Sequence, residues 1–181
     1  MTEQLHRQLV GLGYRVVALE ASNYAELWRQ ESDAAGGVFD PSTGAKKPEA
    51  YAMALGKLSH RVCQEALCAG VVQQRLTVRK AELSGTQAAW DGQVRVAPVV
   101  GAGGMERSFS GTTPALSVEL VLVRADGRPA FHTFGGASLP YRVNFTREAQ
   151  ELRPGLFAND SEVADGVRIA LRPLATPSRA Q

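Results

Sequence analysis

The stretch LSVELVLVRADGRPAFHTF, residues 116–134, decides the fold of this 181-residue chain. Apolar and polar side chains alternate over Leu116–Leu122, which is typical of a strand with one buried and one solvent-exposed face. Asp126 and Gly127 then supply the positive φ values that a tight hairpin turn needs. Because residues 130–134 return as a second apolar run, the stretch predicts an antiparallel hairpin.

Strand patterns extend outward from this hairpin. The segment after Gly70 is long enough to be a strand, Ser84-Gly85-Thr86 predicts a turn, and Gln87–Ala97 predicts a second strand. We therefore expect a mixed sheet with a long antiparallel meander over about residues 71–135.

The segments before and after the meander show apolar side chains at helical spacing, together with helix-capping residues. They predict four helices, over about residues 3–12, 23–34, 48–68 and 161–172. Tyr14–Leu19 (YRVVAL) is an almost continuous apolar run, which predicts a further strand buried on both faces. We expect one three-layer-like domain of the α/β (α+β) class over residues 1–175, with a disordered tail at residues 176–181.

The composition excludes several classes of function. Twenty basic and eighteen acidic residues leave a net charge of +2, with no clustered basic face for nucleic acid. No apolar run approaches the roughly 20 residues of a membrane-spanning helix. A lipid anchor is expected only if the N-terminus is truncated. The three histidines are too dispersed for a metal site, so we expect no metal and no cofactor.

The two cysteines, Cys63 and Cys68, lie in a segment predicted to be helical. Five residues turn a helix by roughly 500°, which would place the two thiols on different faces. The spacing is also not that of a zinc or redox motif. We therefore expect no disulfide between them, but two small helical residues in or near the core.

Two strings carry the candidate site residues, and no catalytic residue is assigned in either. The first, GGVFDPSTG at residues 36–44, places an aromatic residue and a carboxylate in a long loop, where function is often found. The second is Trp90-Asp91-Gly92, which suggests a bulge or a turn with the indole covering the sheet. The candidate binding residues are Phe39, Asp40, Thr43, Trp90 and Asp91. The alternative is structural, with a turn that orders a helix start and a core or edge-capping tryptophan.

Two other arrangements in the sequence have a weaker basis. The glycine-rich stretch 101–111 has no lysine and joins two predicted strands, so it is interpreted as a connection rather than a phosphate loop. A hydrolytic triad can be drawn from Ser108 or Ser110, His132, and Asp126 or Asp40. It lacks the Gly-x-Ser-x-Gly elbow that exposes a nucleophilic serine.

Four short segments resemble a known envelope architecture. They are Leu5–Leu19, the strand after Gly70, the Trp90-Asp91-Gly92 strand, and Gly166–Leu174 (GVRIALRPL). Together they resemble the α/β domain of the curli-export lipoprotein and of the amino-terminal domain of the Tol-system translocation protein. Many small proteobacterial envelope lipoproteins are similar to these. The first strand of that architecture and its lipobox cysteine are absent, and the resemblance implies no catalytic residues.

This resemblance implies a cell-envelope protein. We expect a non-enzymatic module that binds a protein partner or self-associates, through a sheet edge or the Phe39-Asp40 loop. Its expected location is the periplasm, or the periplasmic face of the outer membrane, if a signal sequence was removed. Two alternatives stay open. One is a small hydrolase using Asp40 or His132, and the other is a cytoplasmic small-molecule-binding domain with residues 101–111 as a lid.

Overall fold

A computed structural model describes residues 1–100, 109–144, 149–158 and 160–175. Its helices are α1 (Thr2–Gly11), α2 (Ala21–Ala34), α3 (Pro48–Ala66), α4 (Asp160–Ala170) and α5 (Arg172–Ala175). Its strands are β1 (Gly70–Gly85), β2 (Gln87–Trp90), β3 (Gln93–Val96), β4 (Val99–Val100), β5 (Phe109–Arg124), β6 (Pro129–Ser138), β7 (Tyr141–Asn144) and β8 (Ala149–Leu152). The four predicted helices are present, with ends that differ by a few residues.

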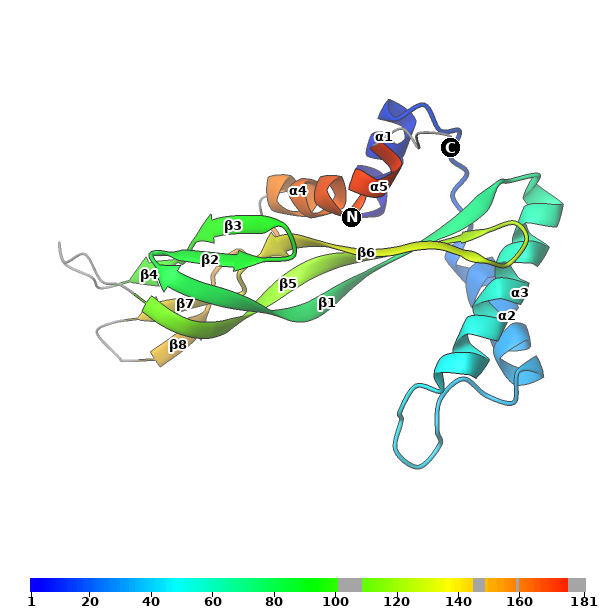
Figure 1. Cartoon of the computed structure of the whole chain (residues 1–181), viewed down its shortest axis with the longest axis horizontal. Helices are drawn as coiled ribbons and strands as arrows, with labels where there is room; N and C mark the ends of the chain where they lie inside the picture. Colours follow the sequence, from blue (N-terminus) through cyan, green and yellow to red (C-terminus); the bar gives the residue numbers. More distant parts are fainter. Residues whose placement is uncertain (101–108, 145–148, 159, 176–181) are drawn as a thin grey trace, which may run out of the picture. The chain divides into compact units, whose positions relative to one another are not determined.

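The strands form two sheets, and the mixed α/β class is confirmed (Figure 1). The larger sheet is antiparallel and has the order β3-β2-β1-β5-β6. The predicted hairpin around Gly127 is its β5–β6 pair, and Gly127 has a φ of 81°. The smaller sheet, β4-β7-β8, was not predicted, and it combines a parallel β4–β7 pair with an antiparallel β7–β8 pair.

The chain divides into two compact units. Unit 1 comprises residues 1–15, 74–120 and 133–181, of which 101–108, 145–148, 159 and 176–181 lie outside the described residues. Unit 2 comprises residues 16–73 and 121–132. Strands β1, β5 and β6 each contribute residues to both units. A single domain over residues 1–175 stays a prediction, and the tail at 176–181 lies beyond what the structure describes.

The core of unit 1 combines one large side chain with several small ones. Trp90 packs in a cluster with Ala81, Ala88, Ala115 and Leu139, all of them buried. Small residues on neighbouring strands leave the space that an indole ring needs in a close-packed interior. The indole N–H donates a hydrogen bond to a backbone carbonyl of β5, so this buried polar group is satisfied.

Helix α4 packs against β6 at a close backbone contact within unit 1. A Cβ on Gly135 would collide with the carbonyl oxygen of Gly166 and lie 2.8 Å from the backbone nitrogen of Ala170. Helix α1 lies along α4, and the amide of Gln8 donates a 2.8 Å hydrogen bond to the carbonyl oxygen of Ala164. Glycine at position 135 therefore sets how closely α4 approaches the sheet.

In unit 2, α2 and α3 lie side by side (Figure 1). The buried face of α3 is held to the β5–β6 hairpin by Ser59, whose hydroxyl lies 3.0 Å from the carbonyl oxygens of both Val123 and Arg124. Three residues before Ser59, a Cβ on Gly56 would lie 2.8 Å from the carbonyl oxygen of Gly127. The hairpin turn therefore sits directly against the helix backbone.

The predicted buried strand at Tyr14–Leu19 is wrong. These residues form no strand, and Val17 is 69% exposed. The segment leads from unit 1 into unit 2, and no described strand pairs with it. An apolar run favours strand geometry, but only a neighbouring strand turns that preference into a sheet.

The single strand predicted over Gln87–Ala97 is also wrong, because it is a hairpin. Its two halves are β2 and β3, which pair antiparallel. Asp91 has a φ of 38° and Gly92 a φ of 75°. Positive φ at two successive residues makes the tight turn that matches strand twist. The turn after β5 differs, because Gly127 has a positive φ there and Asp126 does not.

The prediction that Cys63 and Cys68 do not pair is wrong, since a disulfide joins them with their Cα atoms 4.5 Å apart. Helix α3 ends at Ala66, and Leu67 adopts the left-handed conformation, with φ 51° and ψ 50°. The chain therefore turns back before Cys68, whose N–H donates to the carbonyl oxygen of Cys63. Helical rotation would separate the two thiols only if α3 continued through both cysteines, and it ends between them.

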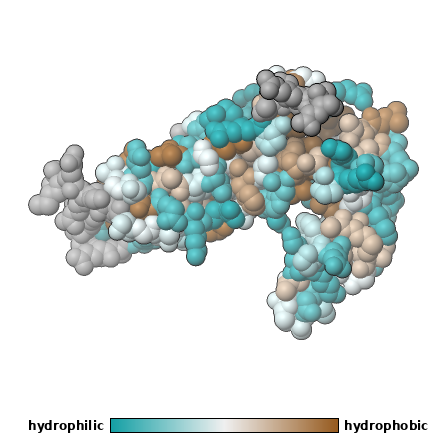
Figure 2. All heavy atoms as spheres, in the orientation of Figure 1, coloured by the Kyte–Doolittle hydropathy of each residue, from teal (hydrophilic) through white to brown (hydrophobic). Residues whose placement is uncertain are grey.

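Among the described residues, none of the helices has the length and apolar character needed to cross a membrane. On the face shown in Figure 2, hydrophobic residues occur in small groups between hydrophilic ones. Small exposed groups of hydrophobic residues are normal on a protein surface.

Candidate functional site

The loop between α2 and α3 is built around the carboxylate of Asp40. Its Oδ1 atom accepts hydrogen bonds from the backbone N–H groups of Ser42 and Thr43, each at 2.9 Å. The hydroxyls of the same two residues donate to that oxygen at 2.6 and 3.1 Å. Four donors on one oxygen make this a rigid Asx turn.

These contacts decide the charge of Asp40. Hydrogen bonds from the Ser42 hydroxyl and from the N–H groups of Thr43 and Ser42 hold the pKa of the Asp40 carboxyl well below its usual range. A general base works best with a pKa near the operating pH. The geometry therefore favours a structural role for Asp40 in fixing the loop.

Backbone hydrogen bonds close the loop into a short hairpin. Phe39 and Lys46 form an antiparallel bridge, and the N–H of Asp40 donates to the carbonyl oxygen of Ala45 at 2.8 Å. Val38, at the base of the loop, is buried. The side chain of Phe39 is 49% exposed, so a fixed backbone presents an aromatic ring to solvent.

Phe39 is the exposed end of a series of aromatic contacts, which we call the aromatic row: Phe39, Tyr51, Trp28 and Tyr24. The Phe39 and Tyr51 rings meet edge to face at 6.2 Å, and Tyr51 meets Trp28 edge to face at 5.1 Å. Trp28 is nearly parallel to Tyr24 at 6.5 Å. The ammonium group of Lys46 lies 4.6 Å from the centre of the Tyr51 ring. Such pairs add stabilisation beyond the area that they bury.

The other end of the row is more enclosed. Burial raises the pKa of the Tyr24 hydroxyl, and Tyr51 adds to that rise, while a hydrogen bond from Gln73 lowers it. The Gln73 amide nitrogen lies 2.6 Å from the Tyr24 oxygen. The aromatic row thus runs from a half-buried, hydrogen-bonded tyrosine to an exposed phenylalanine.

Trp90 and Asp91 lie in unit 1, away in the chain from the loop. Trp90 is 6% exposed, which confirms its interpretation as a core residue. Asp91 accepts a 2.6 Å hydrogen bond from the Ser117 hydroxyl and pairs with Arg79 at 3.1 Å. The Arg79 guanidinium in turn lies 4.3 Å from the centre of the Phe134 ring. These contacts tie the β2–β3 turn to the sheet.

The structure therefore separates the five candidate binding residues into two groups. Phe39, Asp40 and Thr43 share one loop of unit 2, while Trp90 and Asp91 share one turn of unit 1. The loop could be predicted from its turn residues. Tyr24, Trp28 and Tyr51 could not be assigned to it from the sequence, because they lie in two helices and only tertiary packing brings them to Phe39.

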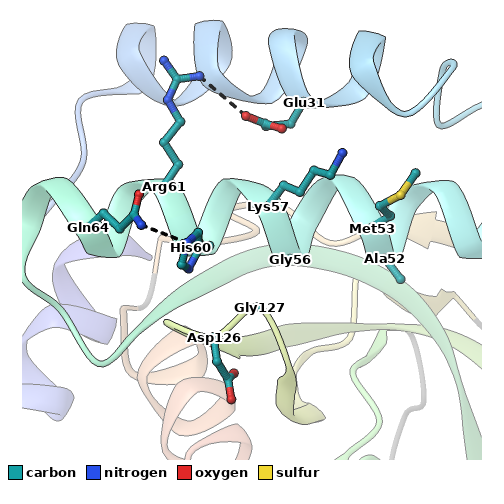
Figure 3. Close-up of a pocket in the computed structure, with 10 residues that line it drawn as sticks. All are labelled: Glu31, Ala52, Met53, Gly56, Lys57, His60, Arg61, Gln64, Asp126 and Gly127. Carbon is teal, nitrogen blue, oxygen red and sulfur yellow. Dashed lines mark hydrogen bonds and ion pairs between the residues drawn. The ribbon is translucent and has the colours of Figure 1, made fainter.

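A groove lies between α3 and the tip of the β5–β6 hairpin, and sequence reasoning missed it as well (Figure 3). Its lining residues are Glu31, Ala52, Met53, Gly56, Lys57, His60, Arg61, Gln64, Asp126 and Gly127. Several of its polar side chains share one face of α3, because helix positions three and four apart are neighbours. A cluster of this kind on one helix could have been noticed from its spacing.

Hydrogen bonds fix most of these polar groups. Arg61 pairs with the amide oxygen of Gln30 at 2.7 Å and with Glu31 at 3.5 Å. His60 Nδ1 lies 2.8 Å from the carbonyl oxygen of Ala125, so Nδ1 carries the proton in that contact. His60 Nε2 can then accept from the Gln64 amide, 2.9 Å away (Figure 3). The groove is lined by groups already engaged within unit 2.

The described residues of the triad hypothesis do not all belong to one unit. Ser108 lies outside the described residues, and Asp40 is occupied by its own turn. Ser110 belongs to unit 1, whereas His132 and Asp126 belong to unit 2. The greater part of the 101–111 stretch also falls outside the description.

The part of the chain that the structure describes holds no cluster of three or more histidine, cysteine, aspartate or glutamate side chains suited to a metal ion. The fold and the loop define the chain as a mixed α/β protein that displays an aromatic side chain on a fixed turn. Comparisons with protein-family models, curated proteins and solved structures find no match to it.

Proposed function

We propose that this chain is a non-enzymatic protein-binding module of the bacterial cell envelope, and that the loop carrying Phe39 is its contact surface. The observation that carries this proposal is the exposed Phe39 ring on a loop fixed by Asp40 and Thr43. A partner chain, or a second copy of this chain, would bury that ring.

Fixing the loop before binding favours association. A flexible loop would lose conformational entropy when a partner orders it, whereas this loop is already held by its backbone bridge and by four hydrogen bonds to Asp40. Aromatic residues are enriched among the few side chains that dominate protein interfaces. The aromatic row behind Phe39 supports its ring in one position.

The Cys63–Cys68 disulfide supports an envelope location. Disulfides persist in oxidising compartments such as the periplasm and are rare in the cytosol. The resemblance to envelope lipoproteins, set out from the sequence, points in the same direction. The proposed location is accordingly the periplasm or the periplasmic face of the outer membrane.

A photo-crosslinking amino acid at position 39, in the protein expressed in its native cell, tests the proposal. We expect a discrete crosslinked species that is absent when the same amino acid replaces Met53, which is 46% exposed in the same unit. Fractionation of the same cells should place the chain in the periplasmic or outer-membrane fraction. Equal crosslinking from both positions, or recovery in the cytosolic fraction, would contradict the proposal.

Binding measurements on variants, made with the purified crosslinked partner, then distinguish a protein-binding surface from a catalytic site. Phe39→Ala should weaken binding at least thirtyfold, about the effect of losing a hot-spot residue. Asp40→Ala should weaken it less, by loosening the loop, and Asp40→Asn should bind normally because its amide retains an oxygen acceptor. A turnover that Asp40→Asn abolishes, with binding unaffected by Phe39→Ala, would instead support the hydrolase alternative.

A further inference from the structure

Leu67 occupies a backbone conformation that suits it poorly. Its φ of 51° lies in the left-handed region, where Cβ crowds the following carbonyl oxygen in every residue except glycine. The side chain is 82% exposed, so packing does little to offset this cost. Something other than side-chain burial must hold Leu67 in this conformation.

The disulfide on either side of Leu67 supplies that constraint. Five residues of continuing helix would separate Cys63 from Cys68 by about 7.5 Å along the helix axis. Disulfide-linked Cα atoms are usually less than about 7 Å apart, and here they are 4.5 Å apart. A closed bridge and a helix that continues through Cys68 therefore exclude each other.

The sequence itself favours the helix at this point. Its pattern predicts a helix to residue 68, and leucine is among the stronger helix formers. Helix α3 nevertheless ends at Ala66. At the corner between α3 and β1, the sequence and the bridge therefore favour different conformations.

We propose that the Cys63–Cys68 disulfide is a redox switch that controls where α3 ends. In the oxidised form the bridge holds Leu67 in the left-handed conformation. When a dithiol reduces it, two electrons and two protons pass to the bridge, Cys63 and Cys68 become thiols, and the dithiol becomes a disulfide. Helix α3 then continues through Leu67 and Cys68.

The switch acts on the start of β1. The carbonyl oxygen of Ala69 accepts a hydrogen bond from the N–H of Ala125, and Gly70 packs against the carbonyl oxygen of Val123. Extending α3 draws these residues away from the β5–β6 hairpin. The change is confined to unit 2, and it does not depend on the proposed partner binding at Phe39.

The test measures the equilibrium between the bridge and dithiothreitol. Cys63 and Cys68 are the only two cysteines of the chain, so counting free thiols by alkylation and mass spectrometry follows this one reaction. Leu67→Gly removes the Cβ that crowds the carbonyl oxygen, and Leu67→Asn offsets that crowding with a local hydrogen bond from its short polar side chain. Both substitutions stabilise the left-handed conformation, which is present only in the oxidised form. Each should therefore require about a tenfold higher ratio of reduced to oxidised dithiothreitol to reach half reduction. Leu67→Ala, the matched control, keeps the Cβ and has no polar group, so it should stay near the parent.

A second measurement observes the helix end directly by NMR. On reduction, the Cα chemical shifts of Leu67 and Cys68 should become helical, and their amide hydrogens should exchange more slowly. The amides of α4, in unit 1, should not change. Unchanged shifts at Leu67 after reduction, or Leu67→Asn and Leu67→Gly midpoints within twofold of the parent, would overturn the switch. Alkylation of either cysteine in the folded, oxidised protein would overturn it as well.

Discussion

At the scale of single residues, buried and half-buried carboxylates hold unit 1 together through paired arginines. Arg153 is the clearest case, because its guanidinium contacts both carboxylate oxygens of Glu162 and also the hydroxyl of Ser138. Burial alone would raise the pKa of Glu162, but hydrogen bonds from Arg153 and Ser138 and the charge of Arg153 outweigh it and lower the pKa. The ionised form is therefore the one that the fold stabilises.

Replacing this carboxylate should make stability less dependent on pH. Glu162→Gln keeps the shape of the side chain and should cost about 2 kcal/mol at pH 7, as expected for hydrogen bonds to a charged group. A lowered folded-state pKa contributes stability that is complete above the unfolded-state value of about 4.3. That contribution declines as the pH falls through the folded-state pKa. Urea unfolding from pH 7 to pH 3 should show the parent and the variant converging at the acidic end.

An exposed carboxylate provides the control for this prediction. Glu82 lies at an exposed position of β1, so Glu82→Gln should change the stability little at any pH. If the free energies of unfolding of the parent and Glu162→Gln differed by the same amount at every pH, the ion pair would not be the cause of the difference.

At the scale of elements, the approach of α4 to β6 depends on the absence of a single methyl group. Gly135→Ala would place a Cβ against the backbone of Gly166, where no flexible side chain can move aside. Overpacking of this kind costs about 3 kcal/mol when backbone must shift. We expect a lower urea midpoint with an unchanged denaturant slope. Gly11→Ala, on a helix with open space around the site, should be neutral or slightly stabilising.

The parts of the structure that could be predicted are those whose sequence pattern lies within a short stretch of the chain. The β5–β6 hairpin and the loop at Phe39 and Asp40 follow from turn residues and alternation within a short stretch. The strand predicted at Tyr14–Leu19 was wrong because an apolar run indicates only a preference for strand, and no strand among the described residues pairs with it. The disulfide failed because the helix end at Leu67 depends on the bridge itself.

The candidate site divides in the same way. Asp40 and Thr43 could be recognised because their hydrogen bonds reach only two or three residues along the chain. The rings that support Phe39 come from α2 and α3, so their meeting is a property of helix packing. The strands β7 and β8 escaped notice because four residues are too few to show a period.

At the scale of the whole molecule, the chain gathers into two units, yet three strands of one sheet contribute residues to both. Hydrogen bonds in a sheet form between whole strands, so β1, β5 and β6 should gain or lose their pairing together. We therefore expect residues 1–175 to unfold in a single cooperative transition, as a single domain of this size usually does.

The two tryptophans make this prediction measurable, because Trp28 lies in unit 2 and Trp90 in unit 1. In Trp28→Phe, fluorescence reports only the burial of Trp90, while hydrogen exchange in α2 and α3 of the same protein reports unit 2. Cooperative unfolding requires both probes to give one urea midpoint and one slope. If α2 and α3 lose protection at a urea concentration where Trp90 is still buried, unit 2 is an independent folding unit. The prediction of a single domain would then be wrong, because the hydrogen bonds between β1, β5 and β6 would not couple the unfolding of the two units.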